Sequence, residues 1–171
     1  MIEYREYSEE GLNFEKLRTG AMPEADFKQA HKGLTLFCHD IFVEYKGKIL
    51  LVVRKNEPAL NAIWPLGGRA MRGMDVQESA KAAVWREARL RIDNLHLLGI
   101  CRTYFKTDPF GHGCGTDTIN AVFYARGEGD LKLDDLHADP VMIDASGYSP
   151  SFARSLSPYV RDFLEAALKV R

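Results

Sequence analysis

A pair of strand-like segments followed by two adjacent glycines restricts the fold of this chain more than any other feature. Residues 34–45 and 48–54 are rich in β-branched and aromatic residues, and Lys46-Gly47 between them is a turn signal. These segments predict a β-hairpin. A loop over residues 56–66 follows, and Gly67-Gly68 then leads towards a helical segment. Glycines allow a backbone to approach a phosphate group closely, so this loop is a candidate binding element.

The helix after the glycine pair is predicted from the spacing of its apolar residues. Asp75 is suited to cap its N-terminus, and Glu78 follows three residues later, as in a capping box. Asp93-Asn94 is expected to end the helix. The apolar residues that share one stripe, with charged residues opposite, are Val76, Ala80, Ala83, Val84 and Leu90.

The remaining segments predict one α/β domain over residues 1–171 with a mixed β-sheet. Residues 1–33 are expected to form an N-terminal arm that packs on the domain, with a short helix over 22–30. Two further strands are predicted, over 95–105 and 116–126, with a glycine-rich loop between them. An acidic loop is expected over 127–140 and a C-terminal helix over 157–170, with Pro158 in its first turn.

Composition limits the classes of partner. The chain has 23 Lys and Arg against 24 Asp and Glu, a net charge of −1. It therefore offers no general attraction to nucleic acid or to an anionic membrane, and an anionic ligand must be held by a few local cations. Cys38, Cys101 and Cys114 form no C-x-x-C pattern and are expected to be reduced thiols. The sequence shows no signal peptide or membrane-spanning run, so a cytoplasmic protein is expected.

The segment WPLGGRAMRGMDVQESAKAAVWREARLRIDN, residues 64–94, resembles the Nudix box, G-x5-E-x7-R-E-U-x-E-E-x-G-U, where U is a bulky aliphatic residue. With Glu78 as the first box glutamate, Arg86-Glu87 follow at the required spacing, and about one extra helical turn lies after Gly68. The resemblance implies a Nudix-type α/β/α sandwich. It also implies a hydrolase whose helix presents glutamates to Mg²⁺, which bridges a nucleoside diphosphate linked to another group.

The second half of the box keeps one of its three carboxylates. Glu87 matches, whereas Leu90 and Arg91 stand where the other two glutamates are expected. Because Mg²⁺ usually takes one or two carboxylates together with waters and phosphates, Glu87 is the candidate metal ligand. Arg91 has two readings. It either forms an ion pair with Glu87 on the same helix face or neutralises phosphate oxygens directly.

Five further stretches resemble the GDP-mannose mannosyl hydrolase branch of the superfamily, which cleaves at a sugar carbon with a histidine base. They are HDIFV from His39, LVVRKNEP from Leu51, GGR from Gly67, GTD from Gly115 and DDLHAD from Asp134. The resemblance implies a homodimer. It assigns catalytic roles to Asp40, His137 and Glu87, and ligand contacts to Arg54, Gly67, Gly68, Arg69 and Arg86. Arg91 stands where that branch keeps a metal-binding glutamate, and it is a candidate ligand contact because its charge could neutralise phosphate oxygens.

Two functions follow from these patterns. The first is a hydrolase of a nucleoside diphosphate sugar, GDP-mannose-like, or of a related nucleoside diphosphate derivative. The second is a Nudix fold that only binds a nucleotide or serves as a regulatory module, which the residues at positions 90 and 91 favour. Three candidates also have purely structural readings: Asp40 as a buried hydrogen-bonding group, Arg54 as a solvated strand end, and His137 as a surface histidine among acidic residues.

Overall fold

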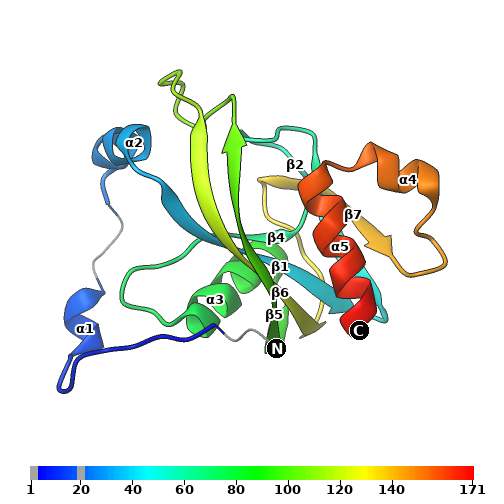
Figure 1. The fold of residues 1–171 in the computed structure, drawn as a ribbon, viewed down its shortest axis with the longest axis horizontal. Coiled ribbons are helices and arrows are strands. Elements are labelled where there is room, and N and C mark those ends of the chain that lie inside the picture. The colour runs from blue at the N-terminus through cyan, green and yellow to red at the C-terminus, as the bar shows by residue number, and fades with distance from the viewer. Residues whose placement is uncertain (1–3, 19–21) are drawn as a thin grey trace.

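A computed structural model describes residues 4–18 and 22–171 and shows a mixed β-sheet between helices (Figure 1). Its strands are β1 Leu36–Tyr45, β2 Lys48–Arg54, β3 Ile63–Trp64, β4 Leu66–Arg69, β5 Arg91–Phe105, β6 Thr116–Glu128 and β7 His137–Ile143. Its helices are α1 Phe14–Leu17, α2 Glu24–Gly33, α3 Val76–Ala88, α4 Pro150–Ser155 and α5 Pro158–Val170. The predicted α/β fold class with a mixed sheet is confirmed. Residues 1–3 and 19–21 of the expected N-terminal arm lie outside the described residues.

Strand β1 has different partners along its two edges. One edge pairs in parallel with β6 from residue 36 to residue 45. The other edge pairs antiparallel with β4 over residues 38–41 and with β2 over residues 43–45. The sheet therefore divides near Phe42, and we call this point the fork. Strand β2 continues the sheet towards β3 and β7, and β5 lies beyond β6.

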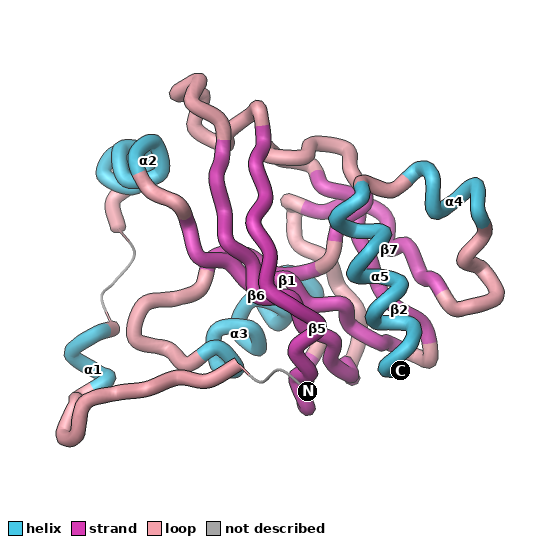
Figure 2. Tube along the Cα trace, viewed as in Figure 1, coloured by secondary structure: helices cyan, strands magenta, loops and turns pink. Residues whose placement is uncertain are grey.

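Helices cover both faces of the sheet because alternate strand residues point to opposite sides. Ile41 of β1 is fully buried in a cluster with Val84 of α3. Its neighbour Phe42 is fully buried in a second cluster with Leu164 of α5. The helices α3 and α5 thus complete the two outer layers of the sandwich, which the tube in Figure 2 lets the reader follow.

Helix α3 begins as predicted and ends earlier than predicted. The backbone N–H of Glu78 donates to Asp75 Oδ1 at 2.7 Å, which confirms the N-cap. The helix ends at residue 88, where Arg89 adopts the left-handed conformation with φ of 57°. This turn sends Leu90, which is fully buried, into the core at the start of β5. The prediction that the helix continues to Asp93-Asn94 is therefore wrong.

Strand β7 is the second difference from the sequence analysis. The expected acidic loop over residues 127–140 is shorter, because β6 runs to Glu128 and β7 begins at His137. Strand β7 pairs antiparallel with β2, with a register shift between Val52 and Val53, beside Pro140. Proline lacks the N–H that a strand ladder needs, so a bulge next to it is expected. The predicted hairpin and the C-terminal helix are confirmed.

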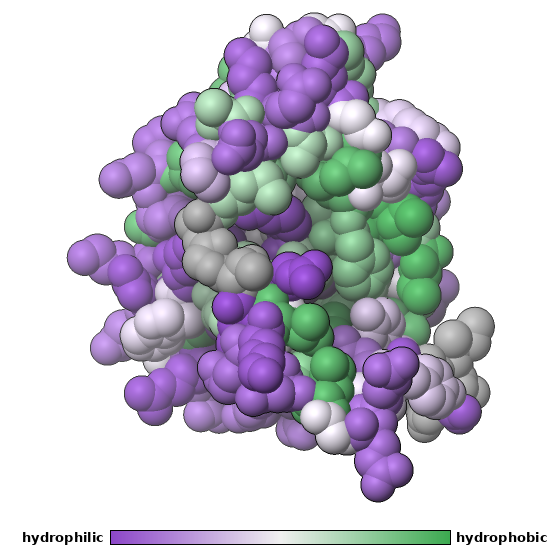
Figure 3. Space-filling model, turned by 90° about the vertical axis from the view of Figure 1, so that its left-hand side faces the viewer, coloured by the Kyte–Doolittle hydropathy of each residue, from purple (hydrophilic) through white to green (hydrophobic). Residues whose placement is uncertain are grey.

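The face that carries α1 and α2 mixes hydrophilic and hydrophobic residues around a hollow (Figure 3). Among the described residues, no helix is both long enough and apolar enough to cross a membrane. Strand β5 and strand β6 extend beyond the rest of the sheet and are joined by the glycine-rich loop, which α2 approaches (Figure 1).

Candidate functional site

A cavity of about 390 Å³ lies beside the fork. This volume is within the range of small-molecule sites. Alternate residues of β1 line it, including Asp40, which belongs to the face of the sheet that α5 covers. The other residues that matter for the site are Phe27 of α2, Arg54 at the end of β2, Trp64 of β3, Gly68 and Arg69 of β4, and Asn120 of β6.

Asp40 is the buried carboxyl group of this cavity. The hydroxyl of Tyr159 on α5 donates a hydrogen bond to Asp40 Oδ2 at 2.5 Å. Burial raises the pKa of Asp40 to about 6, although hydrogen bonds from Tyr159 and Trp64 and the charge of Arg54 act in the opposite direction. A carboxyl group with this pKa can exchange a proton near neutral pH.

Because burial raises the pKa of Asp40, this residue is expected to lower stability as the pH rises. An aspartate in the unfolded chain ionises near pH 4, whereas Asp40 in the folded protein keeps its proton up to about pH 6. The free energy of unfolding should therefore fall by as much as about 3 kcal/mol across this window. Urea denaturation of the wild type and of Asp40→Asn between pH 4 and pH 7 measures the effect. A difference between the two proteins that stays constant with pH would contradict it.

Two guanidinium groups line the cavity with Asp40. Arg54 Nε donates to the backbone oxygen of Pro58 at 2.8 Å. The guanidinium carbon of Arg69 lies 3.8 Å from the ring centre of Phe27, a cation–π contact that orients it. Burial lowers the pKa of both arginines, yet arginine keeps its charge in proteins. The cavity therefore holds two fixed positive charges, which suit an anionic ligand.

Glu87 and Arg86 contact the glycine pair from outside the cavity lining. The backbone N–H of Gly67 donates to Glu87 Oε2 at 2.9 Å, and Arg86 Nη2 donates to Glu87 Oε1 at 2.9 Å. A Cβ atom placed on Gly68 would lie 3.6 Å from Arg86 Nη2. Burial raises the pKa of Glu87, against the effects of Gly67, His137 and Arg86. The glycine pair therefore connects the cavity to the Arg86–Glu87 ion pair: Gly68 lines the cavity, and Gly67 donates to Glu87.

The donor set around Glu87 does not fit a preformed Mg²⁺ site. Its two oxygens already accept hydrogen bonds, one of them from a guanidinium. Leu90, which replaces one box glutamate, is fully buried in the core, and Arg91 lies on β5. In the part of the chain that the structure describes, no three His, Cys, Asp or Glu side chains come together to hold a metal ion.

His137 is buried and does not line the cavity. It opens β7 opposite Arg54, its side chain is buried, and its Nδ1 is 2.7 Å from Asp134 Oδ1. Its neighbour Leu136 lines the cavity, whereas His137 is absent from the lining. The general-base role of His137 stays a prediction.

Arg91 does not join the site. It begins β5, where its guanidinium carbon lies 5.9 Å from the ring centre of Trp85. Both residues line a separate hollow of about 1010 Å³ that shares no lining residue with the cavity. Because Arg91 is not on α3, the expected helical ion pair with Glu87 is wrong.

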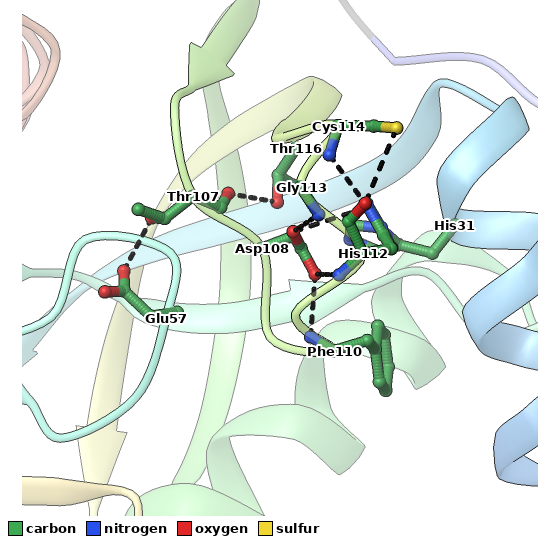
Figure 4. Close-up of polar contacts among 9 residues, drawn as sticks. All are labelled: His31, Glu57, Thr107, Asp108, Phe110, His112, Gly113, Cys114 and Thr116. Carbon is green, nitrogen blue, oxygen red and sulfur yellow. Dashed lines mark hydrogen bonds and ion pairs between the residues drawn. The ribbon is translucent and has the colours of Figure 1, made fainter.

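Helix α2 and the loop over residues 106–115 together build one wall of the cavity, which the sequence did not predict. Figure 4 shows His31 of α2 pointing at His112 of this loop, and His31 Nδ1 lies 2.8 Å from His112 Nε2. Asp108 holds the loop by accepting hydrogen bonds from three of its backbone N–H groups. The Phe110 ring packs edge-on against His31. The Asp108 hydrogen bonds lie within the loop, whereas the contacts of His31 with His112 and Phe110 join distant segments and cannot be found from local spacing.

The fold is similar to solved Nudix structures. A MutT Nudix hydrolase from Burkholderia pseudomallei gives a TM-score of 0.61 at 18% identity, covering 78% of this chain and 98% of that one. A MutT protein from Methanosarcina mazei Go1 gives 0.57 at 19% identity, covering 80% and 94%. The Nudix domain of NrtR from Shewanella oneidensis, complexed with ADP ribose, gives 0.56 at 13% identity, covering 87% and 99%. The chain therefore has a Nudix fold.

These identities establish the fold and no closer relationship. No protein-family model matches the sequence, and no curated protein matches it either. The structural neighbours named above include one protein described as a hydrolase and one domain solved with ADP ribose. The resemblance to the GDP-mannose mannosyl hydrolase branch stays a prediction.

Proposed function

We propose that this protein binds and hydrolyses a nucleoside diphosphate linked to a small group, such as a nucleoside diphosphate sugar. The observation that carries the proposal is the meeting of Arg54, Arg69 and Asp40 in one cavity. Guanidinium groups bind phosphate oxygens through paired, charge-assisted hydrogen bonds. Two of them at one cavity match the charge of a diphosphate, and the buried carboxyl supplies a group for proton transfer.

The rest of the cavity suits a base or a sugar. Trp64 and Phe105 present aromatic surface, with ring centres 5.7 Å apart. Asn56 also lines the cavity, and its Oδ1 is buried without a hydrogen-bond partner among the residues that the structure describes. Buried polar atoms nearly always have a partner. An N–H or O–H group of a ligand would supply the missing donor.

In the proposed reaction, the ionised Asp40 takes a proton from a water molecule. The water oxygen bonds to the anomeric carbon of the sugar, and the bond from that carbon to the diphosphate oxygen breaks. The diphosphate leaves with the electron pair, and the charges of Arg54 and Arg69 stabilise it. The products are free sugar and nucleoside diphosphate. His137 is the second candidate base on the motif resemblance alone, because it does not line the cavity.

A nucleotide-binding module without turnover is the second candidate function. Glu87, the one carboxylate kept from the second half of the box, is buried and paired with Arg86, and Leu90 belongs to the core, so two of the carboxylates that the hydrolase resemblance implies are missing and the third is not free. The similar NrtR domain was solved with ADP ribose. ADP-ribose is therefore a natural probe for both candidate functions.

A panel of GDP-mannose, UDP-glucose and ADP-ribose tests the proposal. We expect at least one compound to bind in isothermal titration calorimetry and to be cleaved, as followed by chromatography of the products. Free sugar with nucleoside diphosphate supports attack at carbon, and sugar phosphate with nucleoside monophosphate supports attack at phosphorus. Asp40→Asn should bind the compound and turn it over more slowly. Binding without any product favours the module, and the absence of binding contradicts the proposal.

A further inference from the structure

We infer that the diphosphate site works without a resident divalent cation, because Arg86, held by Glu87, supplies the positive charge beside the glycine pair. The inference rests on the proposed function and adds to it the source of the charge. Three observations support it: the hydrogen bonds that the Glu87 carboxylate accepts, the position of Arg54 and the exposure of Arg86.

The Glu87 carboxylate is already hydrogen-bonded to other groups of the protein. Its side chain is 9% exposed, and both oxygens accept hydrogen bonds at 2.9 Å, from Gly67 N–H and from Arg86 Nη2. Mg²⁺ keeps several waters and demands near-octahedral geometry. A hydrated ion at Glu87 would have to enter a buried position and displace a guanidinium from it.

Arg54 adds a second fixed charge on the other side of the fork. It lies close enough to Asp40 and Glu87 for both carboxylates to favour its charged form against the effect of burial. Two buried carboxylates are therefore balanced by two guanidiniums, Arg54 and Arg86. A divalent cation placed among these four groups would face two like charges, and the further carboxylate of the cavity lining, Glu57, already accepts a hydrogen bond from Thr107 Oγ1 at 2.6 Å.

Arg86 remains accessible to a ligand. Its side chain is 56% exposed, although its partner Glu87 is buried. Its charge disfavours the charged form of Arg69, so the two guanidiniums lie in the same region. Arg69 follows Gly68 in the chain, and Arg86 Nη2 lies against the position that a Gly68 Cβ would take. Two guanidiniums beside one glycine can each bind one of two linked phosphates.

The first test compares binding with and without a metal ion. ADP-ribose and GDP-mannose are titrated calorimetrically into the protein in buffer with MgCl₂ and in buffer with EDTA. We expect dissociation constants that agree within about twofold, and a loss of about tenfold in both buffers for Arg86→Gln. Binding that requires Mg²⁺ would overturn the inference and leave the proposed function standing. Absence of binding in both buffers would count against the proposed function itself.

Mn²⁺ titrated alone gives a readout that does not depend on the ligand. Electron paramagnetic resonance of free Mn²⁺ should show no saturable site in the wild type. A saturable site that Glu87→Gln abolishes would identify Glu87 as a metal ligand and overturn the inference.

Further variants separate a positioning role of Glu87 from a general loss of structure. If Glu87 acts by holding Arg86, then Glu87→Gln and Arg86→Gln should weaken ADP-ribose binding equally, and the double variant should be no weaker than either. Arg86→Lys should restore part of the affinity. Arg161→Gln is the matched control, because Arg161 pairs with the next residue, Asp162, at 3.0 Å on the exposed side of α5. Additive losses in the double variant would contradict the positioning role.

Discussion

Replacing Gly67 by alanine is expected to destabilise the protein by about 3 kcal/mol or more. A Cβ atom at this position would lie 2.2 Å from the backbone oxygen of His39 and 2.9 Å from Asp40 Cα. Because Gly67 pairs with Asp40 in the ladder between β4 and β1, the clash would separate these strands. Urea denaturation, followed by circular dichroism, measures the change in the free energy of unfolding.

Gly68→Ala is the control that separates the clash from backbone strain. Gly67 and Gly68 have similar positive φ angles, 152° and 141°, which L-residues rarely adopt. The nearest atoms to a Cβ at Gly68 are 3.6 and 3.8 Å away, so only the strain applies there. We expect a loss of about 1–2 kcal/mol for this variant. Equal losses for the two variants would show that the clash does not contribute.

Arg69→Gln is expected to weaken the binding of ADP-ribose about thirtyfold, because a glutamine cannot supply a charged fork to a phosphate. Arg69 reaches the cavity from the end of β4 and is held by its contact with Phe27. The stability of the variant should change by no more than about 1 kcal/mol, since the lost contact is a partly exposed cation–π pair. Calorimetric titration measures the affinity, and urea denaturation measures the stability.

Arg102→Gln provides the matched comparison for Arg69→Gln. Arg102 also stacks on an aromatic ring, with its guanidinium carbon 5.1 Å from the ring centre of Tyr104, but it lies outside the cavity lining and pairs with Asp117. Its loss should leave affinity for ADP-ribose unchanged. An unchanged affinity in Arg69→Gln as well would remove Arg69 from the proposed site.

The hairpin and the start of α3 could be predicted because their signals are local. Lys46-Gly47 lies between two apolar runs, and Asp75 lies one residue before the helix it caps. The end of α3 could not be predicted in the same way. Arg89 adopts a left-handed conformation that glycine usually adopts at this position. The turn that it makes buries Leu90 fully in the core. Tertiary packing thus overrides the helical pattern.

The candidate site could be predicted only in part. The motif resemblance selected Asp40, Arg54 and Arg69, and the structure brings all three to one cavity. Phe27 could not be found from sequence, because its role depends on a contact with Arg69 across the molecule. Arg91 was selected from its place in the box, and the early end of α3 carries it to another surface.

The fork in the sheet has a consequence for how freely the cavity can vary. An opening at a sheet edge normally exposes unpaired backbone groups, which are costly to bury. Here β1 has strand partners along both edges. One edge pairs with β6, and the other pairs with β4 before the fork and with β2 after it. Exchanging side chains such as Cys38 or Asn120 would therefore break no strand pairing. A scaffold of this kind lends itself to retargeting towards other small anions by mutagenesis.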